Sequence, residues 1–254
     1  MPADRAQQLA PDEESGLVSR TVTSPIIYAL DYATVAEAEA GAALVASAVG
    51  MLKVGLELFV RGGPRTVDVG KKNDLPVFLD LKLHDIPETV ERAVAAASGL
   101  GAHALTVHAS GGRAMLGRAV KRAATEGGTL SVCAVTVLTS LDAADLADLG
   151  IAGDARAAAT KLARIAYDEG VRWFVCSPTE VADLRSALGP DATLVTPGVR
   201  PAATAVGDQK RTATPEDAIR AGATWLVVGR PIRDAADPRK TAEAIAQAAI
   251  GARS

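Results

Sequence analysis

Eight short apolar runs recur along the chain, and each is followed by a stretch with helical character. Runs of this kind are typical of strands buried in a parallel sheet. The candidate strands are residues 25–31, 50–54, 76–82, 103–108, 130–138, 171–176, 193–197 and 224–229. The candidate helices are residues 34–49, 56–72, 87–99, 111–126, 155–169, 179–188, 214–221 and 238–251. Thr34 and Glu37 form a capping-box pattern at the first of these helices.

Strands that alternate with helices imply parallel pairing through right-handed crossovers. Eight such units in about 230 residues predict a single (β/α)8 TIM barrel, here residues 25–254. The rival fold is a doubly wound open sheet, which normally carries a glycine-rich phosphate loop after its first strand. That strand ends in Asp31-Tyr32-Ala33, without the loop. The stretch 140–153 is long for a connection, and we expect a short helical turn there, on the rim.

Composition excludes several classes of protein. The 254 residues include 27 Lys+Arg and 30 Asp+Glu, so the net charge of −3 predicts neither a nucleic-acid partner nor an anionic membrane partner. No apolar run reaches the roughly 18 residues that a membrane helix needs. Cys133 and Cys176 are too few and too far apart for a disulfide scaffold or a cysteine-rich zinc site.

The N-terminal segment, residues 1–24, is polar and contains no apolar stretch. A secretory signal needs a basic start followed by an apolar core, so this segment does not resemble one. We therefore expect a mobile N-terminal tail ahead of the barrel. A cytoplasmic location with reduced thiols is the corresponding prediction.

Four charged residues interrupt the apolar strands: Asp31, Lys53, Asp80 and Lys82. Active sites of parallel barrels lie at the C-terminal ends of the strands, where these residues fall. Asp80 and Lys82 are two residues apart, so they share one face of their strand. Buried charges persist only when they are paired. A purely structural ion network is the alternative, but convergence of four such residues favours a catalytic site.

Residue chemistry narrows the reaction that such a site could perform. His84, His103 and His108 do not have zinc-site spacing, and no serine lies in a G-x-S-x-G elbow. A lysine between carboxylates stays protonated, which makes it a poor Schiff-base former but a good proton donor beside a developing carbanion. A carboxylate close to a substrate anion would repel it. The pattern therefore allows a decarboxylation followed by protonation.

Two glycine–arginine segments follow the last two strands. Gly198-Val199-Arg200 comes after the seventh strand and Gly229-Arg230 after the eighth. Barrels often bind phosphate with these two loops, because glycine lets backbone N–H groups approach and arginine pairs with the oxygens. A turn glycine beside a surface arginine is the alternative for either loop alone. Both loops together predict a phosphate site.

The segment FLDLKLHDIPETV, residues 78–90, resembles the D-x-K-x-x-D signature of the orotidine 5′-phosphate decarboxylase family in its bacterial form. Related sugar-phosphate barrels share that short motif, so it is only moderately specific alone. The resemblance continues in order through IIYALD, LKVGLELF, TVHASGG, AVTVLTSLD, VCSPTE, TPGVRP, GDQKRTATPEDAI and VVGRPI. It covers the chain from Pro25 to about residue 245, and the full ordered set is highly specific.

The resemblance implies a carboxy-lyase that converts orotidine 5′-monophosphate to uridine 5′-monophosphate and CO2, the last step of de novo pyrimidine synthesis, without metal or organic cofactor. Asp31 and Lys53 would hold the ribose hydroxyls, and Lys53 would also join the charge array. Asp80 would face the substrate carboxylate. Lys82 would protonate C6 of the ring.

The resemblance also implies a homodimer with shared sites. Asp85 would reach the partner's active site, with Ile86 and Thr89 nearby, which makes Asp85 the fourth catalytic residue beside Lys53, Asp80 and Lys82. The resemblance also assigns substrate contacts to Thr139, near the base, and to Pro197. The residues expected to bind the phosphate are Arg200, Gln209, Gly229 and Arg230.

Two other functions stay open on sequence grounds. One is a sugar-phosphate lyase of the same superfamily, such as hexulose-phosphate synthase or ketogulonate-phosphate decarboxylase, which use Mg²⁺. The other is a catalytically inactive barrel that only binds nucleotide or scaffolds a partner, although the intact charge set argues against it. His84 and His108 are interpreted as loop and rim residues, and the two cysteines as buried packing residues.

Overall fold

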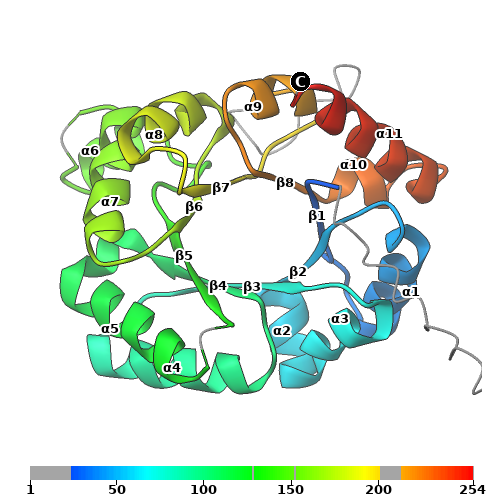
Figure 1. The fold of residues 1–254 in the computed structure, drawn as a ribbon, viewed down its shortest axis with the longest axis horizontal. Helices are drawn as coiled ribbons and strands as arrows, with labels where there is room; N and C mark the ends of the chain where they lie inside the picture. The colour runs from blue at the N-terminus through cyan, green and yellow to red at the C-terminus, as the bar shows by residue number, and fades with distance from the viewer. Residues whose placement is uncertain (1–23, 128, 152, 201–212, 254) are drawn as a thin grey trace, which may run out of the picture.

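The computed structural model describes residues 24–127, 129–151, 153–200 and 213–253. Its centre is a closed barrel of eight parallel strands in the order of the chain, with helices around the outside (Figure 1). This confirms the predicted (β/α)8 barrel and excludes the open sheet. The strands are β1 (Ile26–Ala29), β2 (Met51–Gly55), β3 (Val77–Leu83), β4 (Ala104–His108), β5 (Ser131–Val135), β6 (Trp173–Val175), β7 (Thr193–Thr196) and β8 (Trp225–Val228).

The barrel closes because β1 pairs with both β2 and β8. Ile27 lies opposite Met51 on one side and opposite Val227 on the other. Side chains alternate along each strand, so Ile27 points into the barrel while Ile26 and Tyr28 face the helices. The inner cluster is small and consists of Ile27, Met51, Phe78, Ala104, Cys133 and Val195. The larger core lies between the strands and the helices.

Helices form the outer layer of the molecule (Figure 1). The α-helices are α1 (Val35–Val45), α2 (Leu56–Gly62), α3 (Asp68–Asn73), α4 (Pro87–Gly99), α5 (Gly112–Thr125), α6 (Ala143–Asp148), α7 (Ala155–Asp168), α8 (Val181–Leu188), α9 (Pro215–Arg220), α10 (Arg230–Arg233) and α11 (Pro238–Gly251). Short 3₁₀ turns are η1 (Gly63–Val67), η2 (Ala109–Gly111) and η3 (Pro178–Glu180). Among the described residues, no helix has the length and apolarity needed to cross a membrane.

Several local predictions are confirmed and others need correction. The capping box of Thr34 and Glu37 is present at α1, and the expected turn within 140–153 is α6, capped by Asp142. The expected single helix over 56–72 is wrong, because α2, η1 and α3 divide it. Gly63 ends α2 at φ 64°, and Pro64 follows it. The helix α10 was not predicted, and β5 ends at Val135 rather than at residue 138.

The strand β3 carries an irregularity at the position of the D-x-K motif. From Leu79 to Leu83 this strand advances four residues, while β4 advances two, from Leu105 to Val107. The extra residues form a bulge that contains Asp80 and Lys82. Lys82 adopts a left-handed backbone with φ 51°, which is uncommon for a residue with a side chain. Bulges of this kind re-aim side chains next to functional sites.

The predicted tail, residues 1–24, lies outside the described residues except for Ser24. Ser24 donates a hydrogen bond from Oγ to the carbonyl of Ala48, 2.7 Å away. The elements from Ile26 to Gly251 all belong to the barrel and its helical layer. Because the strands are parallel, their C-terminal ends lie at the same rim of the barrel. The charged residues Asp31, Lys53, Asp80 and Lys82 lie at this rim.

Candidate active site

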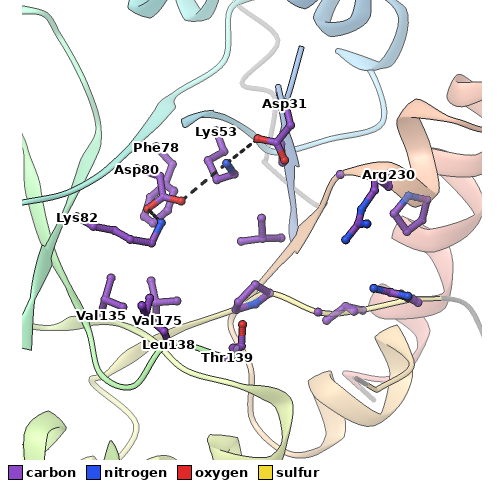
Figure 2. Close-up of a pocket in the computed structure, with 18 of the residues that line it drawn as sticks. Asp31, Lys53, Phe78, Asp80, Lys82, Val135, Leu138, Thr139, Val175 and Arg230 are labelled. Atoms are coloured by element: carbon purple, nitrogen blue, oxygen red, sulfur yellow. Dashed lines mark hydrogen bonds and ion pairs between the residues drawn. The ribbon is translucent and has the colours of Figure 1, made fainter. Parts of the chain in front are cut away.

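A pocket of about 430 Å³ opens at the C-terminal ends of the strands (Figure 2). This volume lies within the range of small-molecule sites. Its lining brings together residues that the sequence singled out: Asp31, Lys53, Asp80, Lys82, Thr139, Pro197, Gly198, Arg200, Gly229 and Arg230. Its apolar lining is contributed by neighbouring strands and loops: Ala29, Phe78, Val135, Val137, Leu138, Val175, Val199, Val227 and Pro231.

Four charges of alternating sign form a row along one side of the pocket. Lys53 Nζ lies 3.0 Å from Asp31 Oδ1 and 3.8 Å from Asp80 Oδ2. Lys82 Nζ lies 2.7 Å from Asp80 Oδ1. The row thus runs Asp31, Lys53, Asp80, Lys82, from the ends of β1, β2 and β3 (Figure 2). The predicted convergence of these charges is present in the structure.

Asp80 is the most buried carboxylate of the row, with 13% of its side chain exposed. Burial raises the pKa of this carboxyl, but the ammonium groups of Lys53 and Lys82 outweigh it, as do hydrogen bonds from Lys82 and Thr106. The pKa of Asp80 therefore lies below its ordinary value. Asp80 consequently stays ionised inside the pocket, which a buried carboxylate without partners could not do.

Gly55 leaves the space that Lys53 needs. A Cβ atom at this position would lie 2.8 Å from Lys53 Nζ and 3.4 Å from Asp31 Oδ1. No side chain can therefore be added at the end of β2 without moving the ammonium group. The sequence motif LKVG contains this glycine, but its role becomes evident only from the distances.

Arg230 lies across the pocket from Lys82 (Figure 2). It is the first residue of α10, directly after Gly229, and Arg200 and Pro197 line the same pocket from the segment after β7. Arg233, on the next turn of α10, donates from Nη1 to the carbonyl of Asp31 at 2.7 Å. This contact joins the arginine-bearing helix to the end of β1, and sequence patterns did not single it out.

Asp85, Ile86 and Thr89 lie outside the pocket in the single chain. Asp85 and Ile86 lie between β3 and α4, and Thr89 lies in the first turn of α4. All three are exposed, and Ile86 has 65% of its surface accessible. Asp85 Oδ1 accepts a hydrogen bond from the backbone N–H of Ile86 at 2.6 Å. Their assignment to a partner's site stays a prediction. Gln209, the remaining predicted phosphate contact, lies outside the described residues.

Thr106 is the polar neighbour that sequence reasoning missed. It lies on β4, is fully buried, and its hydroxyl contacts both Asp80 and the backbone of Lys82. A threonine within a strand is ordinary, so no pattern marked it. The only available signal was its inward position, two residues after Ala104 on the same face.

The predicted burial of the two cysteines is confirmed, while the loop and rim roles of His84 and His108 stay predictions. The rings of His84 and His108 lie 5.3 Å apart at the rim. Burial, together with the charges of His84 and Lys82, lowers the pKa of His108. Cys133 and Cys176 are both fully buried and free, and burial raises the pKa of each thiol. Across the described residues, no three His, Cys, Asp or Glu side chains group as a metal site would require.

This arrangement offers two different environments to one ligand. The arginine end can hold an anion, while the row at the other end can hold hydroxyl groups and supply a proton from Lys82. An anionic group placed against Asp80 would be repelled, and losing that group would relieve the repulsion. The geometry thus suits a ligand with a phosphate at one end and a reacting carboxylate at the other.

Comparison with known proteins agrees with this geometry. The model of the "Orotidine 5'-phosphate decarboxylase / HUMPS family" matches residues 24–245. The chain belongs to this family. A relative named orotidine 5′-phosphate decarboxylase from Anaeromyxobacter sp. (strain K) is 56% identical over 221 residues, which is 87% of this chain and 96% of that one. A relative of the same name from Thermobifida fusca is 52% identical over 226 residues, 89% of this chain and 95% of that one.

A solved structure of orotidine 5′-phosphate decarboxylase from Lactobacillus acidophilus superposes with a TM-score of 0.78 at 33% identity, covering 89% of this chain and 99% of that one. An uncharacterized conserved protein from Geobacillus kaustophilus gives a TM-score of 0.77 at 33% identity, covering 89% and 100%. The family and the carboxy-lyase class predicted from the sequence are confirmed by these matches.

Proposed function

We propose that this chain decarboxylates orotidine 5′-monophosphate to uridine 5′-monophosphate and CO2, the last step of de novo pyrimidine nucleotide synthesis. The observation that carries the proposal is the row Lys53–Asp80–Lys82 facing Arg230 across one pocket. The reaction uses no metal or organic cofactor, because the chain's own charges perform it. The family membership and the names of the relatives support the same reaction.

Binding begins with the phosphate and the ribose. Arg230, the backbone of Gly229 and Gln209 grip the phosphate, with Arg200 supporting the loop, because guanidinium groups pair with phosphate oxygens. Asp31 and Lys53, which form an ion pair of 3.0 Å with each other, hold the ribose hydroxyls through hydrogen bonds. Thr139 and Pro197 contact the base and its surroundings. This binding energy brings the substrate carboxylate next to Asp80.

Repulsion between the two carboxylates destabilises the bound substrate relative to the transition state. Two unit charges 4 Å apart interact by about 4 kcal/mol at an effective dielectric of 20. Breaking the C6–carboxylate bond releases neutral CO2 and leaves the bonding electron pair on C6. The Lys82 ammonium stabilises that carbanion and then transfers a proton from Nζ to C6, which yields the product and a neutral lysine.

The functional unit in this proposal is a cytoplasmic homodimer. Asp85 enters the partner's pocket, completing a row of Lys53, Asp80, Lys82 and the partner's Asp85, while Ile86 and Thr89 contact the partner's ligand. The exposure of these three residues supports this role, because an isolated chain leaves Ile86 with 65% of its surface uncovered. A large apolar side chain on this rim suits burial against a second copy.

One assay tests the function directly. Purified protein is mixed with orotidine 5′-monophosphate in the presence of a chelator, and the loss of substrate absorbance is followed. We expect turnover that is insensitive to the chelator. No turnover of this nucleotide, together with Mg²⁺-dependent turnover of a sugar phosphate, would favour the sugar-phosphate lyase instead. No turnover of either substrate would leave a nucleotide-binding barrel without this activity.

A further inference from the structure

Thr106 lies where the pairing between β3 and β4 is interrupted. Its neighbours on both sides follow a regular register, with Leu79 opposite Leu105 and Leu83 opposite Val107. Between these pairs β3 has the bulge that contains Asp80 and Lys82. A bulge leaves backbone groups without their ladder partners, and a buried N–H without a partner is costly.

The Thr106 hydroxyl makes up for that interruption. It accepts a hydrogen bond from the backbone N–H of Lys82 at 2.8 Å and donates one to Asp80 Oδ1 at 3.0 Å. A hydroxyl has one donor and two acceptor sites, so the two bonds are compatible. One buried side chain thereby contacts both members of the D-x-K pair.

One of the two hydrogen bonds constrains the backbone of Lys82, and the other constrains the carboxylate of Asp80. The bond to Lys82 holds the left-handed backbone at φ 51°, from which the lysine side chain extends. The bond to Asp80 engages Oδ1, the same oxygen that receives Lys82 Nζ at 2.7 Å. The other oxygen, Oδ2, is thereby turned toward Lys53, 3.8 Å away. The hydroxyl thus sets both the direction of the ammonium and the rotation of the carboxylate.

We propose that Thr106 is a positioning residue, whose hydroxyl holds the Asp80–Lys82 pair in the geometry needed for decarboxylation and proton transfer. The proposal rests on the roles assigned above to Asp80 and Lys82. Thr106 does not line the pocket and acts only through its two neighbours. Small displacements of reacting groups are expensive in rate, because about 1 Å of misplacement can cost about 100-fold.

The test separates the hydroxyl from the shape of the side chain. Thr106→Val keeps the branched shape and removes both hydrogen bonds, while Thr106→Ser keeps the hydroxyl and removes a methyl group. We expect Thr106→Val to lower kcat for orotidine 5′-monophosphate by about 10- to 100-fold with little change in KM. Thr106→Ser is expected to stay close to the wild type. Affinity for uridine 5′-monophosphate is expected to be unchanged in both.

Thr66→Val is the matched control. Thr66 is 2% exposed, its hydroxyl donates to the carbonyl of Gly63 at 2.8 Å, and neither residue lines the pocket. Its loss removes a buried hydrogen bond without touching the charged row. We expect thermal destabilisation with unchanged kcat, which distinguishes a general stability effect from loss of positioning.

Three outcomes would overturn the inference. They are a wild-type kcat in Thr106→Val, a Thr106→Ser variant as slow as Thr106→Val, and a loss confined to KM. If Thr106→Val does not fold, Thr106→Ser is compared with Thr106→Ala, which isolates the hydroxyl at equal loss of the methyl group; equal kcat values would then reject the inference. Failure of the proposed function is recognised separately, because the wild type itself would then show no turnover.

Discussion

Asp80 lies between two ammonium groups, and this position lets a buried carboxylate keep its charge. Lys53 and Lys82 approach its two oxygens separately, at 3.8 Å and 2.7 Å. Each charge of the row compensates its neighbour, so removing one member leaves another without its partner. Replacing one charged residue of the row is therefore expected to change both the activity and the stability of the protein.

Replacing Lys82 with Ala is expected to abolish turnover, because, among the residues that the structure describes, the other ammonium group paired with Asp80 is that of Lys53, 3.8 Å away. The variant is expected to retain affinity for uridine 5′-monophosphate, since the arginine end of the pocket is unchanged. Stopped-flow turnover and titration calorimetry measure the two properties. Lys72→Ala removes a surface ion pair with Glu39 and serves as the control. Substantial residual turnover in Lys82→Ala would mean that the proton comes from another group.

Asp80 also predicts how the fold responds to acid. Its pKa in the folded protein lies below the ordinary value of 3.8, so its contribution to stability is complete above that pH. The contribution is lost as the pH falls from 3.8 through the folded pKa, because the folded state resists taking up the proton. Urea unfolding from about pH 5 to about pH 3 should show a shallower decline for Asp80→Asn than for the wild type. Identical slopes would contradict this prediction.

At the scale of elements, the site depends on where strands end and how they deviate from regularity. Lys53 lies two residues before the end of β2, and Gly55 at that end keeps the space around the lysine open. The bulge in β3 re-aims Lys82, and α10 presents Arg230 from the opposite side. The strand end at Gly55, the bulge in β3 and the start of α10 thus position the charged side chains of the site.

Gly55→Ala is the corresponding test at the end of β2. Its new Cβ would lie 2.8 Å from Lys53 Nζ, so the ammonium must move away from Asp31 or Asp80. We expect kcat/KM to fall by about 10-fold or more, without unfolding. Gly99→Ala, at the end of α4, adds a methyl group into open space and should leave kcat/KM unchanged. Equal activities of the two variants would show that Lys53 tolerates displacement.

The sequence predicted the regular parts of this architecture and the identity of the charged row. Apolar runs and helical patterns are local, and charges inside apolar strands such as Lys53 and Asp80 are conspicuous, so both could be recognised without coordinates. The bulge, the division of 56–72 at Gly63, and the contact of Thr106 with Asp80 depend on tertiary pairing. A hydrophobic pattern contains no information about such pairings, and Thr106 became identifiable only from distances.

At the scale of the whole molecule, exposed residues lie beside the pocket that opens at the C-terminal ends of the strands. Asp85, Ile86 and Thr89 follow β3, the strand that supplies Asp80 and Lys82, yet they remain outside their own chain's pocket. A two-fold arrangement places the same patch of both chains in contact, so each could complete the other. In the proposed dimer, each pocket is thus complete only when the other chain supplies its Asp85.

Mixing two inactive variants tests this arrangement. In a dimer of Lys82→Ala with Asp85→Ala, one site lacks both groups and the other has both. Random co-assembly should therefore restore about a quarter of wild-type turnover in the unseparated mixture, because about half of the dimers are mixed, and about half of wild-type turnover in the mixed dimer alone, because one of its two sites is complete. Differently tagged chains are co-expressed, and the doubly tagged species is isolated and assayed. Absence of recovery in that species would contradict shared sites.

The left-handed lysine of β3 has a consequence for anyone who engineers this barrel. A residue with a side chain is less favourable than glycine at φ 51°, by about 1 kcal/mol. Glycine at position 82 would relieve that cost, but it would also remove the ammonium group that lies 2.7 Å from Asp80. Thermostabilisation of this enzyme therefore calls for a screen that measures product, because resistance to heat alone does not select for the chemistry of the lysine side chain.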